Sequence, residues 1–178
     1  MSSDEKALYR YHEQLLDLTP PWRVTDFKLD VAKSRLDIHV EWPKDGAPVH
    51  CPECDELYQI HDHRDERTWR HLDTMQLQTF LHCQVPRADC PTHGVGTVKT
   101  PWSGKNSRFT LFFERLAIDM LLAARNITKA CELLKISWDQ LVGPSVKTRF
   151  ATLFVAGVVT EGLGQSSDSA FGSLRSTS

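Results

Sequence analysis

The sequence predicts an α+β protein in which a small β-rich module is followed by an all-helical segment. Apolar and polar residues alternate in "SRLDIHVEW" and in "QLQTFLHCQV", which is the period of strands that bury one face. After Arg108 the apolar residues recur instead at the spacing of an amphipathic helix. With 178 residues, 40% hydrophobic and 25% charged, the chain has the composition of a globular protein of one ordinary domain or two small ones.

Residues 1–48 are predicted to form a helix and a β-hairpin. The helix is expected over residues 4–18, with Asp4 as its N-cap and "TPP" as its stop signal. The two strands of the hairpin are expected over residues 22–30 and 34–42, joined by a short turn at "AKS". Four side chains fall on one face of the predicted helix: Leu8, His12, Leu15 and Leu16.

Two similar stretches bracket the next region. "CPEC" (residues 51–54) and "CPTHG" (residues 90–94) each hold two possible metal ligands separated by two residues, with proline after the first. The start of the chain is charged and has no long apolar run, so we expect a cytoplasmic protein without a signal peptide or membrane span. Thiols stay reduced in the cytoplasm, so the five cysteines are expected to be ligands or small core residues rather than disulfides.

The paired stretches indicate a structural zinc ion. Zinc takes four thiolate or imidazole ligands in a tetrahedron, and two facing turns supply them as a Cys3His set: Cys51, Cys54, Cys90 and His93. Four protein ligands leave no open position for water, which favours a structural over a catalytic site. The alternative is a set of scattered core cysteines with a surface histidine, and two matching pairs argue against it. Residues 49–100 are thus expected to form a zinc-binding β module, with strands within 57–63, 67–73 and 76–85.

The fourth zinc ligand is less well determined by the residues alone. On an alternating strand Cys83 shares a face with Leu81, which favours a packing role for its thiol. Cys131 lies in the middle of a predicted helix, where a small apolar side chain is the better interpretation. The residues between the pairs that compete with His93 are His50, His61, His63, His82 and Cys83.

Residues 108–150 are predicted to form a helix-turn-helix segment. Five apolar residues recur at helical spacing in its first helix: Phe109, Phe112, Phe113, Leu116 and Met120. "TKACELLKIS" then gives a short helix with small residues at Ala130 and Cys131, followed by a tight turn. Ser137 is a suitable N-cap for the next helix, and Gln140 completes a capping box. The predicted fold is therefore a zinc-ribbon-like β module followed by an all-α helix-turn-helix segment.

The charge distribution favours nucleic acid as the partner of this segment. Residues 99–150 carry 9 basic and 4 acidic side chains, although the whole chain has a formal charge of −2. Lysine and arginine side chains contact phosphates, and Gln140 is the best candidate for a base edge. An ordinary helical hairpin with a solvated charged face is the alternative. The candidate DNA-binding residues are Lys129, Lys135, Ser137, Trp138, Asp139, Gln140, Lys147 and Arg149.

The order of several motifs resembles the N-terminal half of bacterial insertion-sequence transposases of the ISL3 family. These motifs are "PPWRV", "CPEC", "RTWRHLD", "VPRADCPTHGV", "TPWSGKNSRFT" and "LLKISWD", and the likeness spans roughly residues 8–142. In that family a zinc finger and a helix-turn-helix bind the terminal inverted repeats of the element. The resemblance implies zinc at Cys51, Cys54, Cys90 and His93, DNA reading near residues 137–140, and no ligand role for Cys83.

The resemblance does not extend to the catalytic domain of that family. Full-length members continue into a nuclease with a ribonuclease-H-like fold, in which an acidic triad holds divalent metal. Only 28 residues follow Phe150, and their two carboxylates are Glu161 and Asp168. We therefore expect a truncated protein without catalytic residues or nuclease activity, ending in a disordered Gly/Ser-rich tail over residues 157–178. Gly143-Pro144 is expected to shorten or kink the second helix.

The expected partner is double-stranded DNA at transposon ends, bound in the bacterial cytoplasm at the nucleoid. A full-length transposase or a second copy of the chain is a further expected partner, and no membrane is involved. The alternative functions are a zinc-dependent protein-interaction module and an accessory subunit of an active transposase.

Overall fold

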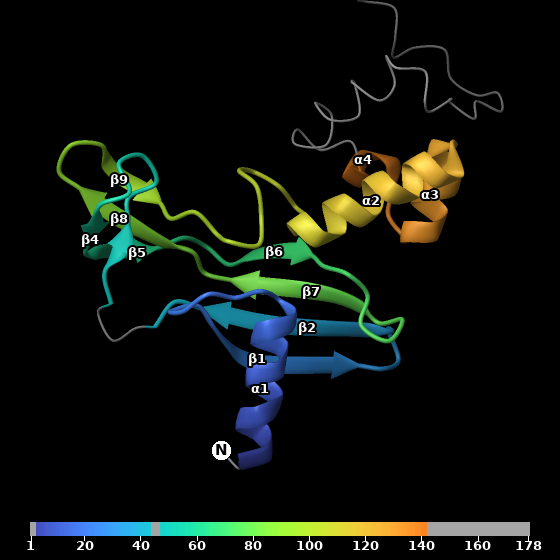
Figure 1. Ribbon diagram of the computed structural model, residues 1–178, viewed down its shortest axis with the longest axis horizontal. Coiled ribbons are helices and arrows are strands. Elements are labelled where there is room, and N and C mark those ends of the chain that lie inside the picture. The colour runs from blue at the N-terminus through green and yellow to red at the C-terminus, as the bar shows by residue number, and fades with distance from the viewer. Residues whose placement is uncertain (1–2, 44–46, 142–178) are drawn as a thin grey trace, which may run out of the picture.

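The computed structural model describes residues 3–43 and 47–141, in which strands make up the first part and helices the last (Figure 1). None of the described helices is long and apolar enough to cross a membrane. The elements in chain order are α1 (Ser3–Leu15), β1 (Arg23–Asp30), β2 (Arg35–Glu41), β3 (Val49–His50), β4 (Leu57–Tyr58), β5 (Ile60–His63), β6 (Arg67–Arg70), β7 (Gln78–Cys83), β8 (Pro86–Cys90), β9 (Gly94–Thr97), α2 (Leu111–Ala124), α3 (Ile127–Leu134) and α4 (Trp138–Leu141).

Several predictions fall on residues that the structure does not describe. These are the candidate contacts Lys147 and Arg149, the helix break at Gly143-Pro144, and the tail at 157–178, all of which lie outside the described residues.

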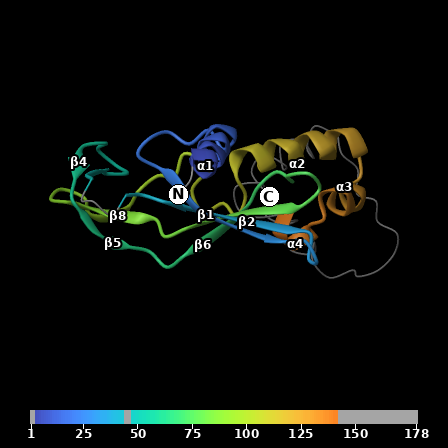
Figure 2. The ribbon, with the colours of Figure 1, turned by 90° about the horizontal axis from the view of Figure 1, so that it is seen from below.

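The central sheet has four strands in the order β1-β2-β7-β6. The predicted hairpin is confirmed, because β1 and β2 pair antiparallel. β2 pairs parallel with β7, and β7 pairs antiparallel with β6. Leu36, Ile38 and Val40 alternate with half-buried polar residues along β2, so one face of the sheet builds the core. Figure 2 shows α1 and α2 on the same side of this sheet.

The strands of residues 67–83 belong to this sheet and not to the part that carries the two ligand pairs. These strands were predicted to belong to the zinc-binding β module of residues 49–100. The reason for the difference is the buried face of β7, where Leu81 and Cys83 continue the apolar face of β2. The ligand pairs lie on a small lobe of five other strands, β3 with β4 and β5-β8-β9 (Figure 1, left). The domain boundaries stay predictions.

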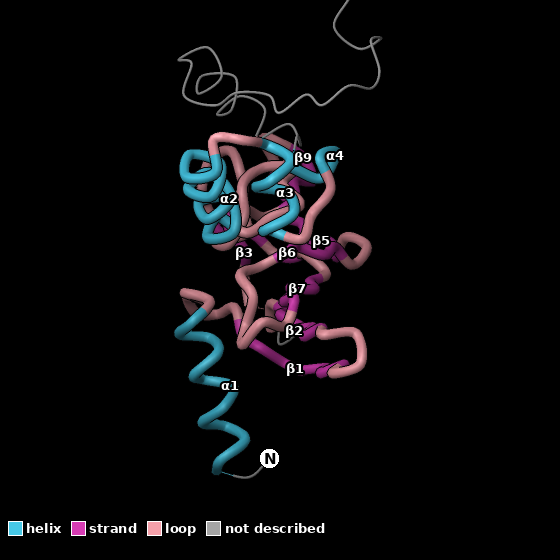
Figure 3. The backbone as a smooth tube through the Cα atoms, turned by 90° about the vertical axis from the view of Figure 1, so that its right-hand side faces the viewer, coloured by secondary structure: helices cyan, strands magenta, loops and turns pink. Residues whose placement is uncertain are grey.

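Helix α1 is shorter than predicted and packs on the sheet through Tyr9 and through His12, which was predicted on its inner face. Its backbone turns at Asp17, which has φ of +52°, and Asp4 lies inside the helix rather than at its N-cap. Tyr9 and His12 contact the ring of Phe27 on β1, at centroid distances of 5.0 and 4.4 Å. The predicted apolar face is therefore only partly buried: Leu16 lies in the core just after the helix, whereas Leu8 and Leu15 are exposed. Figure 3 shows α1 projecting past the edge strand β1.

The helical segment has a core of its own. Phe109 and Phe113 stack at 5.0 Å, and Phe113 and Leu121 are almost completely buried. Phe112, predicted on the same face, is 42% exposed, because the buried stripe runs through residues 113, 117 and 121 instead. The small residues Ala130 and Cys131 are buried in this core, as predicted for the helix crossing.

Residues 107–110 attach the helical segment to the edge of the sheet. Arg70 forms an isolated parallel bridge with Phe109. The Arg70 N–H donates to the carbonyl oxygen of Arg108 at 2.9 Å, and the Thr110 N–H donates to the carbonyl oxygen of Arg70 at 3.0 Å. Because these bonds continue the pattern of a strand beside β6, they fix where α2 begins.

Candidate metal centre and nucleic-acid interface

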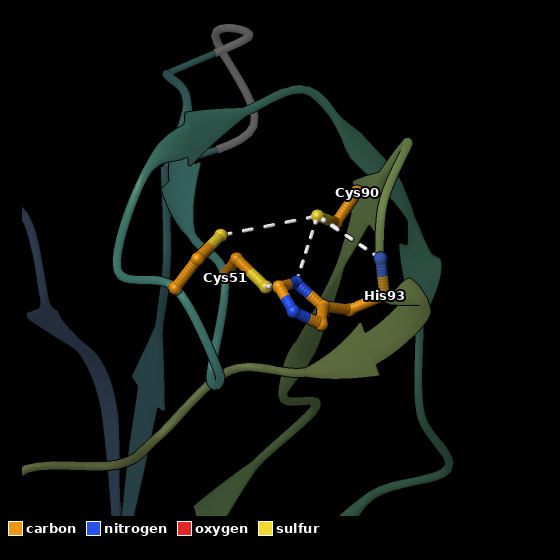
Figure 4. Close-up of side chains that lie close together, drawn as sticks. Cys51, Cys90 and His93 are labelled. Carbon is orange, nitrogen blue, oxygen red and sulfur yellow. Dashed lines mark hydrogen bonds between the residues drawn. The ribbon is translucent and has the colours of Figure 1, made fainter.

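The four predicted zinc ligands come together in the small lobe. Cys51 follows β3, Cys54 lies in the turn before β4, Cys90 ends β8, and His93 lies in the turn to β9. Their ligand atoms all lie within 4.8 Å of one another, and Cys51 and Cys90 are buried. Figure 4 shows the thiol groups of Cys51 and Cys90 and the ring of His93 pointing toward one another.

The distances fit the edges of one zinc tetrahedron. Zn–S bonds of about 2.3 Å and Zn–N bonds of about 2.0 Å give S···S edges of about 3.8 Å and S···N edges of about 3.5 Å. The Cys54 and Cys90 sulfurs are 3.9 Å apart, and the Cys90 sulfur is 3.4 Å from His93 Nδ1. Cys51 Sγ is 3.9 Å from the same nitrogen. The cofactor is a structural zinc ion, which these residues would hold through three sulfurs and Nδ1.

The backbone of the two turns is shaped for this arrangement. Asp55 and Gly94 follow the two ligand pairs with φ of +63° and +71°, a region that glycine enters freely and aspartate tolerates. The His93 N–H donates to Cys90 Sγ at 3.4 Å. A Cβ at Gly96 would lie 2.8 Å from the Pro52 ring, so β9 approaches the first turn only because residue 96 has no side chain.

The thiols have unequal acidity before metal binds. Burial raises the pKa of Cys90, but the backbone N–H groups of His93 and Thr92 outweigh it and lower that pKa to about 6. At Cys54 the N–H of Glu56 lowers the pKa, but burial and the neighbouring thiols raise it by more, so the pKa of Cys54 is raised overall. A thiolate at Cys90 near neutral pH favours metal capture there, because the thiolate is the form that binds zinc.

Tyr58 is a residue of this site that the sequence analysis missed. Its hydroxyl bonds to Cys90, and this contact, together with burial, raises the pKa of Tyr58 to about 12. A donor to a ligating sulfur orients the ligand and spreads its charge. The available signal was the position of Tyr58 on the short strand after the first pair, opposite Val49.

The competing ligands lie elsewhere. Cys83 is buried in the sheet, where desolvation raises its pKa to about 12, as expected of a packing residue. Cys131 is buried between α2 and α3. His82 Nε2 lies 2.5 Å from a carboxylate oxygen of Asp37, on the polar face of the sheet. Within the part of the chain that the structure describes, no group of three or more potential ligands other than the Cys3His cluster could hold a metal.

The turn between α3 and α4 has the geometry of a helix-turn-helix. Lys135 ends α3 in the left-handed conformation with φ of +54°, and the Ile136 N–H donates to the carbonyl oxygen of Cys131 at 3.1 Å. The predicted capping box is present at the start of α4. The Gln140 N–H donates to Ser137 Oγ at 3.3 Å, and the Ser137 N–H donates to Gln140 Oε1 at 3.0 Å.

The other candidate DNA-binding residues are distributed around this turn. Lys129 is exposed and pairs with Glu132 at 3.6 Å, whereas Lys135 is exposed and has no carboxylate partner among the described residues. Trp138 begins α4, and Asp139 follows it with an exposed side chain. The capping box occupies the side-chain oxygen of Gln140. Its NH2 group thus remains for a base, whereas bidentate reading of adenine needs both atoms.

The geometry defines a class of protein, in which a zinc ribbon is followed by a helix-turn-helix. The family model for the zinc finger of transposases IS204/IS1001/IS1096/IS1165 matches residues 47–93. The model for the helix-turn-helix domain of transposase family ISL3 matches residues 98–143. Residues 47–93 and 98–143 are therefore similar to the zinc-finger and helix-turn-helix domains of ISL3-family transposases.

Two relatives agree with this assignment. They are the transposases for insertion sequence element IS1557 from two strains of Mycobacterium tuberculosis, CDC 1551 / Oshkosh and ATCC 25618 / H37Rv. Each is 38% identical to this chain over 72 residues, which is 40% of this chain and 16% of the relative. The chain thus matches only a small share of each relative's length. No solved structure matches the chain significantly.

Proposed function

We propose that the zinc ribbon and helix-turn-helix bind double-stranded DNA at the terminal inverted repeats of an insertion sequence, without cutting it. The observation that carries the proposal is the helix-turn-helix turn at residues 135–137, which is fixed at both ends by hydrogen bonds. The local excess of basic side chains over residues 99–150 supports a polyanionic partner. The DNA-binding regions of the family support nucleoid DNA in the cytoplasm as the place of action.

We propose binding without cleavage because of the residues that phosphoryl transfer requires. Two-metal nucleases need convergent carboxylates. In the described ranges, residues 3–43 and 47–141, the one cluster suited to metal is made of thiols and an imidazole. As a further partner we propose a full-length transposase or a second copy of the chain. The exposed apolar side chains Leu8, Tyr11 and Leu15 on α1 support a protein contact there.

A gel-shift experiment tests the proposal. The zinc-loaded full chain is titrated against a duplex that carries the terminal inverted repeat beside its coding sequence, and against a scrambled duplex of equal length. We expect tighter binding to the repeat, a salt-dependent affinity, and loss of binding after zinc is chelated, because the metal maintains the small lobe. The stoichiometry of the shifted complex reports whether a second copy joins.

The same duplex with magnesium tests cleavage. Cutting of the repeat by the purified chain would overturn the proposal that it binds without cutting. Equal affinity for the repeat and the scrambled duplex would overturn sequence recognition, and failure to bind either duplex would overturn DNA binding itself.

A further inference from the structure

A groove of about 490 Å³ lies between the central sheet and the turn that precedes α4. Its walls come from three parts of the chain: β6 and β7, residues 106–109, and residues 135–140. The sheet side is the face opposite the apolar core, because Arg70 and Phe80 pair across β6 and β7 on the other side of the strands from Trp69 and Thr79, and Arg70 is itself buried. The other side includes Lys135 and Gln140 of the predicted DNA-reading segment.

The groove is lined by cations without a carboxylate. The four basic side chains are Arg67, Arg70, Arg108 and Lys135, and none of the lining residues is acidic. Arg70 is neutralised, because its guanidinium pairs with Asp73. For the other three, no carboxylate partner is found among the residues that the structure describes. A local excess of about three positive charges therefore faces the groove.

One of these cations is held by its guanidinium, and another is positioned by its main chain. The Arg67 guanidinium donates to the carbonyl oxygen of Ser107 at 3.1 Å and lies over the Trp69 ring at 4.8 Å. Neither contact compensates its charge. The main chain of Arg108 is fixed by the bond from the Arg70 N–H, while its side chain is exposed. Cations that are ordered in advance lose less conformational entropy when they bind an anion.

We propose that this groove binds the phosphate backbone of the same duplex that the helix-turn-helix reads. The proposal rests on the DNA binding proposed above, and it adds β6 and residues 106–109 to the interface. Arginine and lysine with amide donors are the groups that contact DNA phosphates, and the groove offers the amides of Gln78 and Asn106 beside its cations. An acidic protein surface would match the same charges. The shared wall at Lys135 and Gln140 favours DNA, because it joins the groove to the helix expected in the DNA groove.

The variant Arg108→Gln tests this proposal with Arg10→Gln as its matched control. Arg10 is exposed on α1 and does not line the groove, and each change removes one positive charge. Affinity for duplex DNA is measured across salt concentrations, with zinc content and melting temperature as checks of folding. Loss of one phosphate contact lowers the slope of log affinity against log salt by about 0.9 and weakens binding about five- to tenfold at 0.1 M salt. We expect both changes for Arg108→Gln and neither for Arg10→Gln.

Each result bears on one proposal or on both. Equal affinities and equal salt slopes for the wild type and Arg108→Gln would overturn the groove while leaving DNA binding intact. A weaker affinity with an unchanged salt slope would also overturn it, because a phosphate contact must release counterions. A wild type that binds no duplex would remove both proposals together.

Discussion

The small lobe and the helical segment are stabilised in different ways. The small lobe consists of strands of two to five residues, and its buried side chains are small or medium-sized, among them Val49, Cys51, Pro86, Ala88 and Cys90. The helical segment buries two larger apolar side chains, Phe113 and Leu121, almost completely. Each such side chain contributes about 1.5–3 kcal/mol when it leaves water. Metal coordination therefore stabilises the small lobe, whereas apolar packing stabilises the helical segment.

This difference explains why the two regions respond to different perturbations. Val49 and Ala88 join the small lobe to the apolar cluster of the central sheet, and we expect a bound metal to stabilise the rest of its short strands. The helical segment is instead joined by hydrogen bonds to Arg70 of β6 and to the adjacent His71. The three predictions that follow separate these two modes of stabilisation.

Removal of a zinc ligand has the largest expected effect. In Cys51→Ser the small lobe should unfold, because zinc contributes about 10–16 kcal/mol in zinc-finger peptides and a whole domain is stable by only about 5–15 kcal/mol. Metal analysis and thermal unfolding followed by circular dichroism measure the change. Cys131→Ala is the matched control, since Cys131 lies in the helical core, and it should retain one zinc per chain. Full zinc content in Cys51→Ser would contradict the assignment of that ligand.

Protonation of His71 has an intermediate expected effect. Burial and the nearby Arg70 lower the pKa of His71 to about 4, and its Nδ1 lies 2.9 Å from Thr110 Oγ1 at the start of α2. Between pH 6.5 and 4 the unfolded chain binds the extra proton and the folded chain does not. The free energy of unfolding is thus highest above pH 6.5 and falls by up to about 3 kcal/mol as the pH drops through this window.

His71→Gln isolates this effect from acid release of zinc. Glutamine keeps an acceptor near Thr110 but does not titrate, and zinc loss acts on both proteins alike. Urea unfolding at pH 7, 6, 5 and 4 should give a wild-type curve that is steeper in pH than that of the variant. Parallel curves would show that His71 does not couple the helical segment to pH.

Loss of a helix cap has the smallest expected effect. Asn126 caps α3 by accepting the Lys129 N–H at 3.0 Å in an exposed position. Asn126→Ala should lower the free energy of unfolding by about 1 kcal/mol, whereas Asn126→Asp should restore it, since aspartate caps equally well. Zinc content should be unchanged in both. A loss of zinc in Asn126→Ala would show that the two regions are coupled more tightly than their separate cores indicate.

Local sequence signals predicted the elements of the fold better than their pairing. Alternation identified β2 and β7 and the buried side of Cys83, and the spacing of the cysteines identified the metal site. No local signal shows that Arg35 lies beside Gln78, because a parallel pairing between distant strands depends on the whole core. On α2 the spacing correctly predicted Phe113 in the core and Leu116 and Met120 against it, but it also placed Phe112 there, which is 42% exposed.

The residues of the candidate site differ in the same way in how well local sequence signals predicted them. The zinc ligands belong to two short motifs and were predicted together. The residues of the basic groove come from β6, β7, residues 106–109 and residues 135–140, so no window of sequence contains them. Gln140 was predicted both as a cap partner and as a base reader. The structure shows the cap, and the base contact stays a prediction.

The strand-like link at residues 107–110 has a consequence for dividing the chain into fragments. The two matched family models meet between residues 93 and 98, which invites expression of the helices from that point onward. Such a fragment would lack the carbonyl oxygen of Arg70 that accepts the Thr110 N–H. It would also lack Leu72, which packs against the apolar cluster of the helical segment. The two modules are separate in the sequence but in contact in the structure. The smallest fragment of the helix-turn-helix that folds by itself therefore has to include residues 67–72.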